Sequence, residues 1–210
     1  MMDHKSGQRL SRPEPTTVLV IGGSDSGKSA VAEDYACLVG KGRPLYYLAT
    51  MQTGTQAAAD KISKHQNQRA GKGFITIEQP LAVWSEELSQ LLSDQSARPV
   101  VLLEDLGNLV ANELFGQSAP AFENRPVWEQ WKKDTGRRIL DWCAQLCAIS
   151  DLIIVSNDVF RDGCRYEAGT EDFRQVLAEI HLDLAVRSEV VEVVGGLADI
   201  ISDRVRRQHD

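Results

Sequence analysis

The sequence is poor in cysteine and histidine, the side chains that most often hold zinc and similar metals. Its 210 residues include four cysteines and four histidines, and no two cysteines form a CxxC pair. Cys143 and Cys147 lie one helical turn apart in an apolar stretch, without enough further ligands nearby for a metal site. We therefore interpret the cysteines as buried free thiols, which suits a reducing cytosol.

Long apolar runs and an excess of positive charge are also missing. No apolar segment reaches the roughly 18 residues that a membrane-spanning helix needs, and the polar start of the chain lacks the apolar centre of a secretory signal. Residues 1–16 are predicted to be a disordered lead-in, and the protein to be cytoplasmic without a membrane span. The formal net charge of −7 argues against a nucleic-acid partner, because such surfaces need clustered Lys and Arg.

What the sequence does have is a regular alternation of short apolar runs and longer segments with helical spacing. The predicted strands cover 18–21, 45–49, 74–77, 100–103, 152–155 and 190–194. The predicted helices cover 28–39, 56–69, 81–92, 106–115, 128–148 and 170–186. Because the central strands are apolar throughout, this order predicts an α/β fold with a mostly parallel central sheet and helices on both faces. No interior linker is visible, so we expect residues 17–210 to form a single domain.

A phosphate-binding loop follows the first predicted strand. The run GGSDSGKS matches the pattern G-x-x-x-x-G-K-[ST]. Its residues are Gly22, Gly23, Ser24, Asp25, Ser26, Gly27, Lys28 and Ser29. A chance Gly/Ser turn is the alternative, but this run follows an apolar strand and opens a helix, as the pattern requires. We therefore predict a P-loop NTPase-like domain that binds GTP or ATP.

The chemistry of this loop gives its residues separate roles. Its glycines allow backbone N–H groups to turn inward, and the following helix adds its positive N-terminal dipole. Lys28 is placed to reach the β- and γ-phosphates, and the hydroxyl of Ser29 to ligate Mg²⁺. Asp25 is unusual beside a phosphate site, and we expect it to point to solvent rather than to help hold Mg²⁺.

The fourth predicted strand ends in two acidic residues, Glu104 and Asp105. The carboxyl ends of parallel strands face the crevice in which ligands bind. There Glu104 can hold Mg²⁺ or accept a hydrogen bond from a ribose, whereas Asp105 is well placed to cap the helix that follows. Asn157 and Asp158 end the next strand and fit either the same crevice or a turn.

A histidine and an arginine share one face of the polar predicted helix 56–69. His65 and Arg69 are separated by one helical turn, as i and i+4. Such spacing is common for a solvated surface histidine. It also suits a nucleophilic imidazole beside a guanidinium that grips phosphate. The spacing alone leaves both interpretations open.

Several ordered segments resemble the bifunctional adenosylcobinamide kinase / adenosylcobinamide-phosphate guanylyltransferase family of cobalamin biosynthesis. The resemblance covers about residues 18–194 and rests on GGSDSGKSAVAE, YLATM, KISKHQNQRAGKGFITIEQP, LLEDLGNLVANELF and VSNDVFRDG, with a weaker FRQVLAEIHLDLA. It implies an enzyme with two reactions. One phosphorylates adenosylcobinamide from GTP or ATP. The other transfers GMP from GTP to the new phosphate, giving adenosylcobinamide-GDP and pyrophosphate.

The resemblance also implies site residues and an assembly. His65 would carry the guanylyl group, with Lys28 as the second catalytic residue. Besides the P-loop, the GTP site would include Thr50, Met51, Gln66, Arg69, Glu78 and Glu104. Members of the family are oligomers, typically trimers, so a homo-oligomer is expected.

The chain departs from the family pattern at a few positions, and two other interpretations stay open. The differing residues are Asp25, Lys64, Ala178 and His181. They leave the pattern from His65 to Arg69 and the P-loop intact, and they bear mainly on the corrinoid side of the site. The alternatives are another P-loop kinase for a small metabolite and a non-catalytic GTP-binding relative.

Overall fold

The computed structural model describes residues 16–52, 71–93 and 95–194. Its strands form one sheet in the order β3-β2-β4-β5-β1-β6, and all neighbouring strands in it are parallel. The strands are β1 (Thr17–Gly22), β2 (Leu45–Ala49), β3 (Phe74–Glu78), β4 (Val100–Glu104), β5 (Asp151–Asn157) and β6 (Glu189–Val193). The predicted α/β fold is therefore confirmed, and each strand lies close to its predicted bounds.

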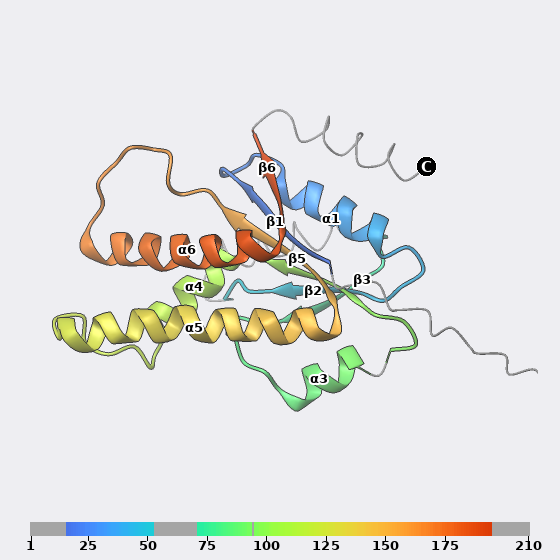
Figure 1. Cartoon of the computed structure of the whole chain (residues 1–210), viewed down its shortest axis with the longest axis horizontal. Coiled ribbons are helices and arrows are strands. Elements are labelled where there is room, and N and C mark those ends of the chain that lie inside the picture. Colours follow the sequence, from blue (N-terminus) through green and yellow to red (C-terminus); the bar gives the residue numbers. More distant parts are fainter. Residues whose placement is uncertain (1–15, 53–70, 94, 195–210) are drawn as a thin grey trace, which may run out of the picture.

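Helices cover both faces of this sheet. They are α1 (Lys28–Val39), α3 (Glu86–Ser93), α4 (Leu106–Phe115), α5 (Arg125–Ile149) and α6 (Ala168–Arg187). Figure 1 shows α1 against one face and α4, α5 and α6 against the other. The predicted helix 56–69 lies outside the described residues. Across the residues that are described, no helix is both long enough and apolar enough to cross a membrane.

Two apolar cores, one on each face of the sheet, explain why the central strands are apolar throughout. Along β4, Val101 and Leu103 belong to the core shared with α4, α5 and α6, while Val100 and Leu102 belong to the core shared with α1. All of these side chains are fully buried. Burying one of them stabilises the fold by roughly 1.5–3 kcal/mol, so a strand with two apolar faces is held in the middle of the sheet.

Buried and exposed positions mostly follow the sequence pattern, with one exception among the cysteines. Trp128 is buried, and His181 is buried with its Nε2 atom 2.7 Å from Ser156 Oγ. Burial lowers the pKa of His181 to about 4, so its role is that of a neutral core residue. Cys143 is buried as expected, and Cys37 and Cys147 are half-buried. The expectation is wrong for Cys164, which lies exposed in the loop between β5 and α6.

The predicted helix 81–92 is the element whose start differs most, because α3 begins only at Glu86. The side-chain amide of Gln79 donates hydrogen bonds to the carbonyl oxygens of Leu81, at 2.6 Å, and Val83, at 3.3 Å. These bonds tie up carbonyls that an earlier helix would need for its own ladder. Local side-chain bonding therefore outweighs the helical spacing in this stretch.

The strand register brings the carboxyl ends of the strands to one edge of the sheet. Ala49 on β2 pairs with Glu78 on β3 and with Glu104 on β4. Gly22, where the P-loop begins, pairs with Asn157 on β5. Only β5 separates the P-loop strand from the strand that ends in Glu104. Most of the residues predicted for the site therefore collect along this edge.

Candidate active site

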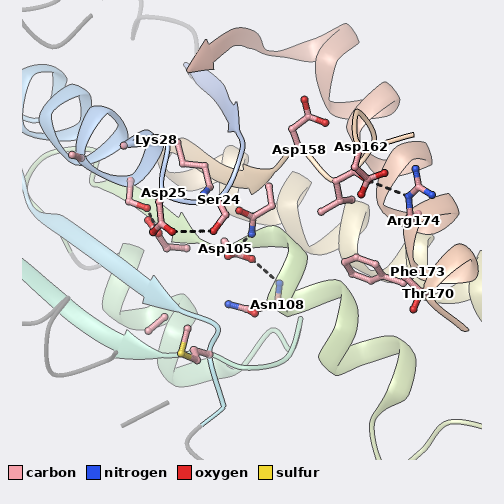
Figure 2. A pocket seen from close by; sticks show the side chains of 18 of the residues that line it. Ser24, Asp25, Lys28, Asp105, Asn108, Asp158, Asp162, Thr170, Phe173 and Arg174 are labelled. Atoms are coloured by element: carbon pink, nitrogen blue, oxygen red, sulfur yellow. Dashed lines mark hydrogen bonds between the residues drawn. The ribbon is translucent and has the colours of Figure 1, made fainter. Parts of the chain in front are cut away.

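A cavity of about 790 Å³ opens at the carboxyl edge of the sheet (Figure 2). It is lined by the P-loop, by the ends of β2, β3 and β4, and by the segment that runs from β5 into α6. The P-loop residues at its wall are Ser24, Asp25, Gly27, Lys28 and Ser29. Gly22, Gly23 and Ser26 belong to the loop but are not among the lining residues. The structure thus places the predicted P-loop at a cavity of ligand size.

Backbone geometry explains the glycines at both ends of the loop. At Gly22, an added Cβ atom would lie 2.5 Å from Ser26 Oγ and 2.7 Å from the carbonyl oxygen of Val193. Gly27 is the N-cap of α1 and has a φ of 89°, which residues with a side chain rarely adopt. Asp25 also has a positive φ, of 54°, and its side chain is exposed as expected. The loop therefore has a shape that depends on small residues.

Two polar side chains inside the loop are buried. Lys28 lines the cavity, and its Nζ donates a long hydrogen bond of 3.3 Å to the carbonyl oxygen of Gly23. Ser26 is buried too, and its Oγ has no hydrogen-bond partner among the described residues. A buried hydroxyl without a partner costs about 1–3 kcal/mol, so a bound water accounts for it best. Of these two side chains, Lys28 is the one placed to contact a ligand in the cavity.

Glu104 and Ser29 meet at the cavity although 75 positions separate them in the sequence. Ser29 Oγ donates a short hydrogen bond to Glu104 Oε1. The other carboxylate oxygen, Glu104 Oε2, is buried and has no partner within the described ranges. Burial raises the pKa of Glu104 from 4.5 to about 7, and the hydrogen bond from Ser29 only partly opposes this rise. A cation beside this carboxylate would therefore stabilise its ionised form.

The donor set of Glu104 and Ser29 fits a magnesium ion. Mg²⁺ prefers oxygen ligands and commonly takes one or two from the protein, with the rest from water and substrate phosphates. The free carboxylate oxygen and the hydroxyl supply two such ligands beside the P-loop. Within the described part of the chain, no group of three or more His, Cys, Asp and Glu side chains forms a metal cluster. Phosphate oxygens and waters are the usual further ligands of such an ion.

Asp105 and Thr50 tie the strand ends together. Asp105 is the N-cap of α4, as predicted, because its Oδ1 accepts a hydrogen bond from the backbone N–H of Asn108 at 2.6 Å. Its Oδ2 accepts one from the Asn157 side chain at 3.1 Å. Thr50 is fully buried and donates from Oγ1 to the carbonyl oxygen of Asp105 at 2.8 Å. Thr50 is not among the residues lining the cavity; its contact holds the end of β2 to the end of β4.

The other residues predicted for the GTP site divide into two groups. Met51 and Glu78 line the cavity at the ends of β2 and β3. His65, Gln66 and Arg69 lie outside the described residues. The structure therefore brings the first group to the cavity that the P-loop faces, and it does not place the second.

The α6 side of the cavity is the part that the sequence patterns did not reveal. Its residues are Val159, Asp162, Tyr166, Thr170, Phe173 and Arg174. Asn157 and Asp158 also line the cavity, and their position at a strand end was the signal that pointed to them. Phe173 has no such signal, because in sequence it reads like any apolar residue of an amphipathic helix. Its place at the cavity depends on how α6 packs against the other helices.

Among the described residues, carboxylates outnumber cations around the cavity. The acidic lining residues of these ranges are Asp25, Glu78, Glu104, Asp105, Asp158 and Asp162, and the basic ones are Lys28 and Arg174. A triphosphate carries several negative charges of its own, so its binding beside these carboxylates needs positive charge to offset them. A divalent cation between the carboxylates and the phosphates is the ordinary solution.

Comparison with known proteins gives one finding for nearly the whole chain. A family model described as cobinamide kinase / cobinamide phosphate guanyltransferase matches residues 18–200. The matched range runs from β1 through β6, and it includes the P-loop, Glu104 and the segment that holds His65. A search of the curated proteins found no match.

Proposed function

The chain belongs to the cobinamide kinase / cobinamide phosphate guanyltransferase family, and we propose that it performs both reactions with one P-loop and a guanylylated histidine. Its family makes it a transferase of cobalamin biosynthesis that uses GTP or ATP. The assignment of individual residues to the steps rests on the cavity and on the resemblance of the motifs.

In the kinase reaction, the hydroxyl oxygen of the acceptor forms a bond to the γ-phosphorus of the nucleotide. The bond from that phosphorus to the β–γ bridging oxygen breaks, and the hydroxyl proton passes to a cavity carboxylate or to water. Backbone N–H groups at the start of α1 and the Nζ of Lys28 hold the β- and γ-phosphates during this transfer. Glu104 and Ser29 would hold Mg²⁺, which would supply further charge neutralisation.

In the guanylyl transfer, a ring nitrogen of His65 forms a bond to the α-phosphorus of GTP as the bond to pyrophosphate breaks. The phosphate of the phosphorylated acceptor then bonds to the same phosphorus, and the phosphorus–nitrogen bond breaks to release the imidazole. Arg69, one helical turn away in the predicted helix, binds the α-phosphate charge. Met51 and Glu78 support this assignment, because they line the cavity and flank the His65 segment in the sequence.

One observation supports this proposal more than any other: the half-buried, hydrogen-bonded pair of Glu104 and Ser29 beside the buried Lys28, at the wall of a ligand-sized cavity. A covalent-labelling experiment tests the histidine step. The protein is incubated with GTP labelled at the α-phosphate and then separated on a denaturing gel. We expect a label on the protein that acid removes and alkali does not, as for a phosphorus–nitrogen bond.

The matched variants are His65→Ala and Lys64→Ala, which change neighbouring residues. His65→Ala should abolish the label, and Lys64→Ala should keep it. A label that persists in His65→Ala refutes the histidine assignment. A wild-type protein that phosphorylates the acceptor but never carries a label refutes the covalent route while leaving the kinase reaction in place.

A further inference from the structure

The P-loop takes up one side of the cavity, and the opposite side has no ligand assigned to it. Figure 2 shows Phe173, Thr170 and Arg174 of α6 across the cavity from Lys28. Val159 and Tyr166, which precede α6 in the chain, complete this side. None of these residues takes part in the steps above, so the acceptor is the ligand left for them to bind.

A second hollow of about 410 Å³ extends this side of the cavity. It shares Thr170 and Phe173 with the main cavity and continues to Ala111, Phe115 and Gly169. The two hollows therefore adjoin at Thr170 and Phe173, on the first turns of α6 between the P-loop and the last turn of α4. We call the surface around this junction the α4–α6 groove and define it by Phe115, Tyr166, Thr170 and Phe173.

Two aromatic side chains in this groove are exposed yet held in position. Phe115 is 48% exposed and Tyr166 is 42% exposed. Phe115 stacks on Trp128, with ring centres 5.9 Å apart, and Trp128 Nε1 donates to the buried Asp172 at 2.8 Å. The Arg174 guanidinium lies 5.3 Å from the centre of the Tyr166 ring. Exposed aromatic rings that are held in fixed positions are typical of a ligand-binding surface.

We propose that the α4–α6 groove binds the corrin macrocycle of the acceptor and directs its hydroxyl arm towards the P-loop. This inference rests on the proposed function, because it takes cobinamide as the acceptor. A corrin is a broad, mainly apolar ring with amide arms at its rim. It therefore needs aromatic surface for its face, which Phe115 and Phe173 provide, and polar groups for its amides, which Thr170 and Arg174 provide.

The size of the cavity favours this division between the two hollows. A volume of about 790 Å³ is comparable to pockets that hold one ligand of nucleotide size, since such pockets span roughly 300–1,000 Å³. A nucleotide in contact with the P-loop, Met51 and Glu78 uses most of that space. The macrocycle then has to lie outside it, and the hollow beside Phe115 adjoins the cavity at Thr170 and Phe173, on the α6 side.

Thr170→Trp tests the inference, because Thr170 is exposed and lies where the two hollows join. The bulky ring should fill the groove without disturbing the core. Leu182→Trp is the matched control, since Leu182 is on the same helix and 70% exposed. Equilibrium dialysis with adenosylcobinamide, followed by its visible absorbance, gives the affinity of each protein. We expect Thr170→Trp to bind about tenfold or more weakly and Leu182→Trp to bind as the wild type does.

A second variant, Phe115→Ser, removes aromatic surface in the outer hollow instead of filling the junction, and it should also weaken corrinoid binding. Unchanged corrinoid affinity in both Thr170→Trp and Phe115→Ser overturns the inference, and so does an equal loss in Leu182→Trp. Labelling of the protein by GTP needs no acceptor, which separates the two proposals. A wild-type protein that binds corrinoid but takes no label contradicts the role of His65. A wild-type protein that takes the label, together with unchanged corrinoid affinity in both variants, contradicts the role of the groove.

Discussion

Glu104→Gln is the substitution that tests the candidate metal site most directly. Glu104 is half-buried, with one carboxylate oxygen accepting from Ser29 and the other fully buried and without a partner in the described residues. Burial raises its pKa from 4.5 to about 7, so the folded protein holds this proton more tightly than the unfolded chain does. Ionised Glu104 therefore costs the folded state about 3 kcal/mol at a pH above its folded pKa.

The direction of the pH dependence follows from this difference in proton binding. The stabilising contribution of protonated Glu104 is fully present below pH 4.5 and is lost as the pH rises through about 7. Glutamine stays neutral at every pH. Without metal, Glu104→Gln should thus be more stable than the wild type by up to about 3 kcal/mol at about pH 8, and the two should unfold alike in acid.

Magnesium should reverse that order, because it binds the ionised carboxylate. Stabilisation of the wild type by Mg²⁺ should grow as the pH rises, with apparent affinity falling about tenfold per pH unit below the pKa of Glu104. Glu104→Gln should gain little from the ion. The assay is unfolding by guanidinium chloride, followed by tryptophan fluorescence, with and without Mg²⁺ across this pH range.

Glu78→Gln is the control for this experiment, since Glu78 is an exposed carboxylate at the end of β3, on the other side of β2 from β4. Mg²⁺ should stabilise Glu78→Gln as much as it stabilises the wild type. If the free energy of unfolding has the same pH dependence in the metal-free wild type and in metal-free Glu104→Gln, then burial does not raise the pKa of Glu104 as argued. If Mg²⁺ stabilises both proteins equally, Glu104 is not a metal ligand.

Two further substitutions test the loop and the scaffold behind it. Gly22→Ala places a Cβ atom 2.7 Å from the carbonyl oxygen of Val193. We therefore expect a loss of about 1–3 kcal/mol in the free energy of unfolding, together with weaker GTP binding in a calorimetric titration. Unchanged GTP binding would show that the loop tolerates the added methyl group. Asp172→Asn removes the charge that pairs with the buried Lys132 at 2.7 Å, and should cost about 3 kcal/mol in denaturant unfolding. Asp172→Glu should retain more of that stability, and equal losses in both would mean that shape rather than charge decides.

Much of the fold was predictable because it follows from local patterns. Strand β4 is apolar on both faces, and a run of this kind is stable only in the middle of a covered sheet. Helix α1 begins at Lys28, immediately after Gly27, as the loop pattern requires. The start of α3 was predicted too early because the side chain of Gln79 donates hydrogen bonds to nearby carbonyl groups. The spacing of apolar residues contains no information about such bonds.

The candidate site was predictable only in part. The P-loop and Glu104 could be recognised in the sequence, because a glycine pattern and the end of an apolar strand are both local features. Thr50 shows what such reasoning leaves open. The resemblance implies a place for it in the nucleotide site, and the structure adds that it is buried and that its hydroxyl donates to the backbone of Asp105. Which way a side chain points at a strand end depends on its neighbours across the sheet.

The sequence by itself determined the order of strands and helices, the position of the phosphate loop and the family of the chain. Each of these depends on residues that are close together in the sequence or on motifs that keep their order. Only the tertiary structure decided that Ser29 meets Glu104 and that Phe173 faces Lys28 across one cavity. The physical reason is that such contacts join segments far apart in the chain, and they exist only once strand register and helix packing have fixed where each segment lies.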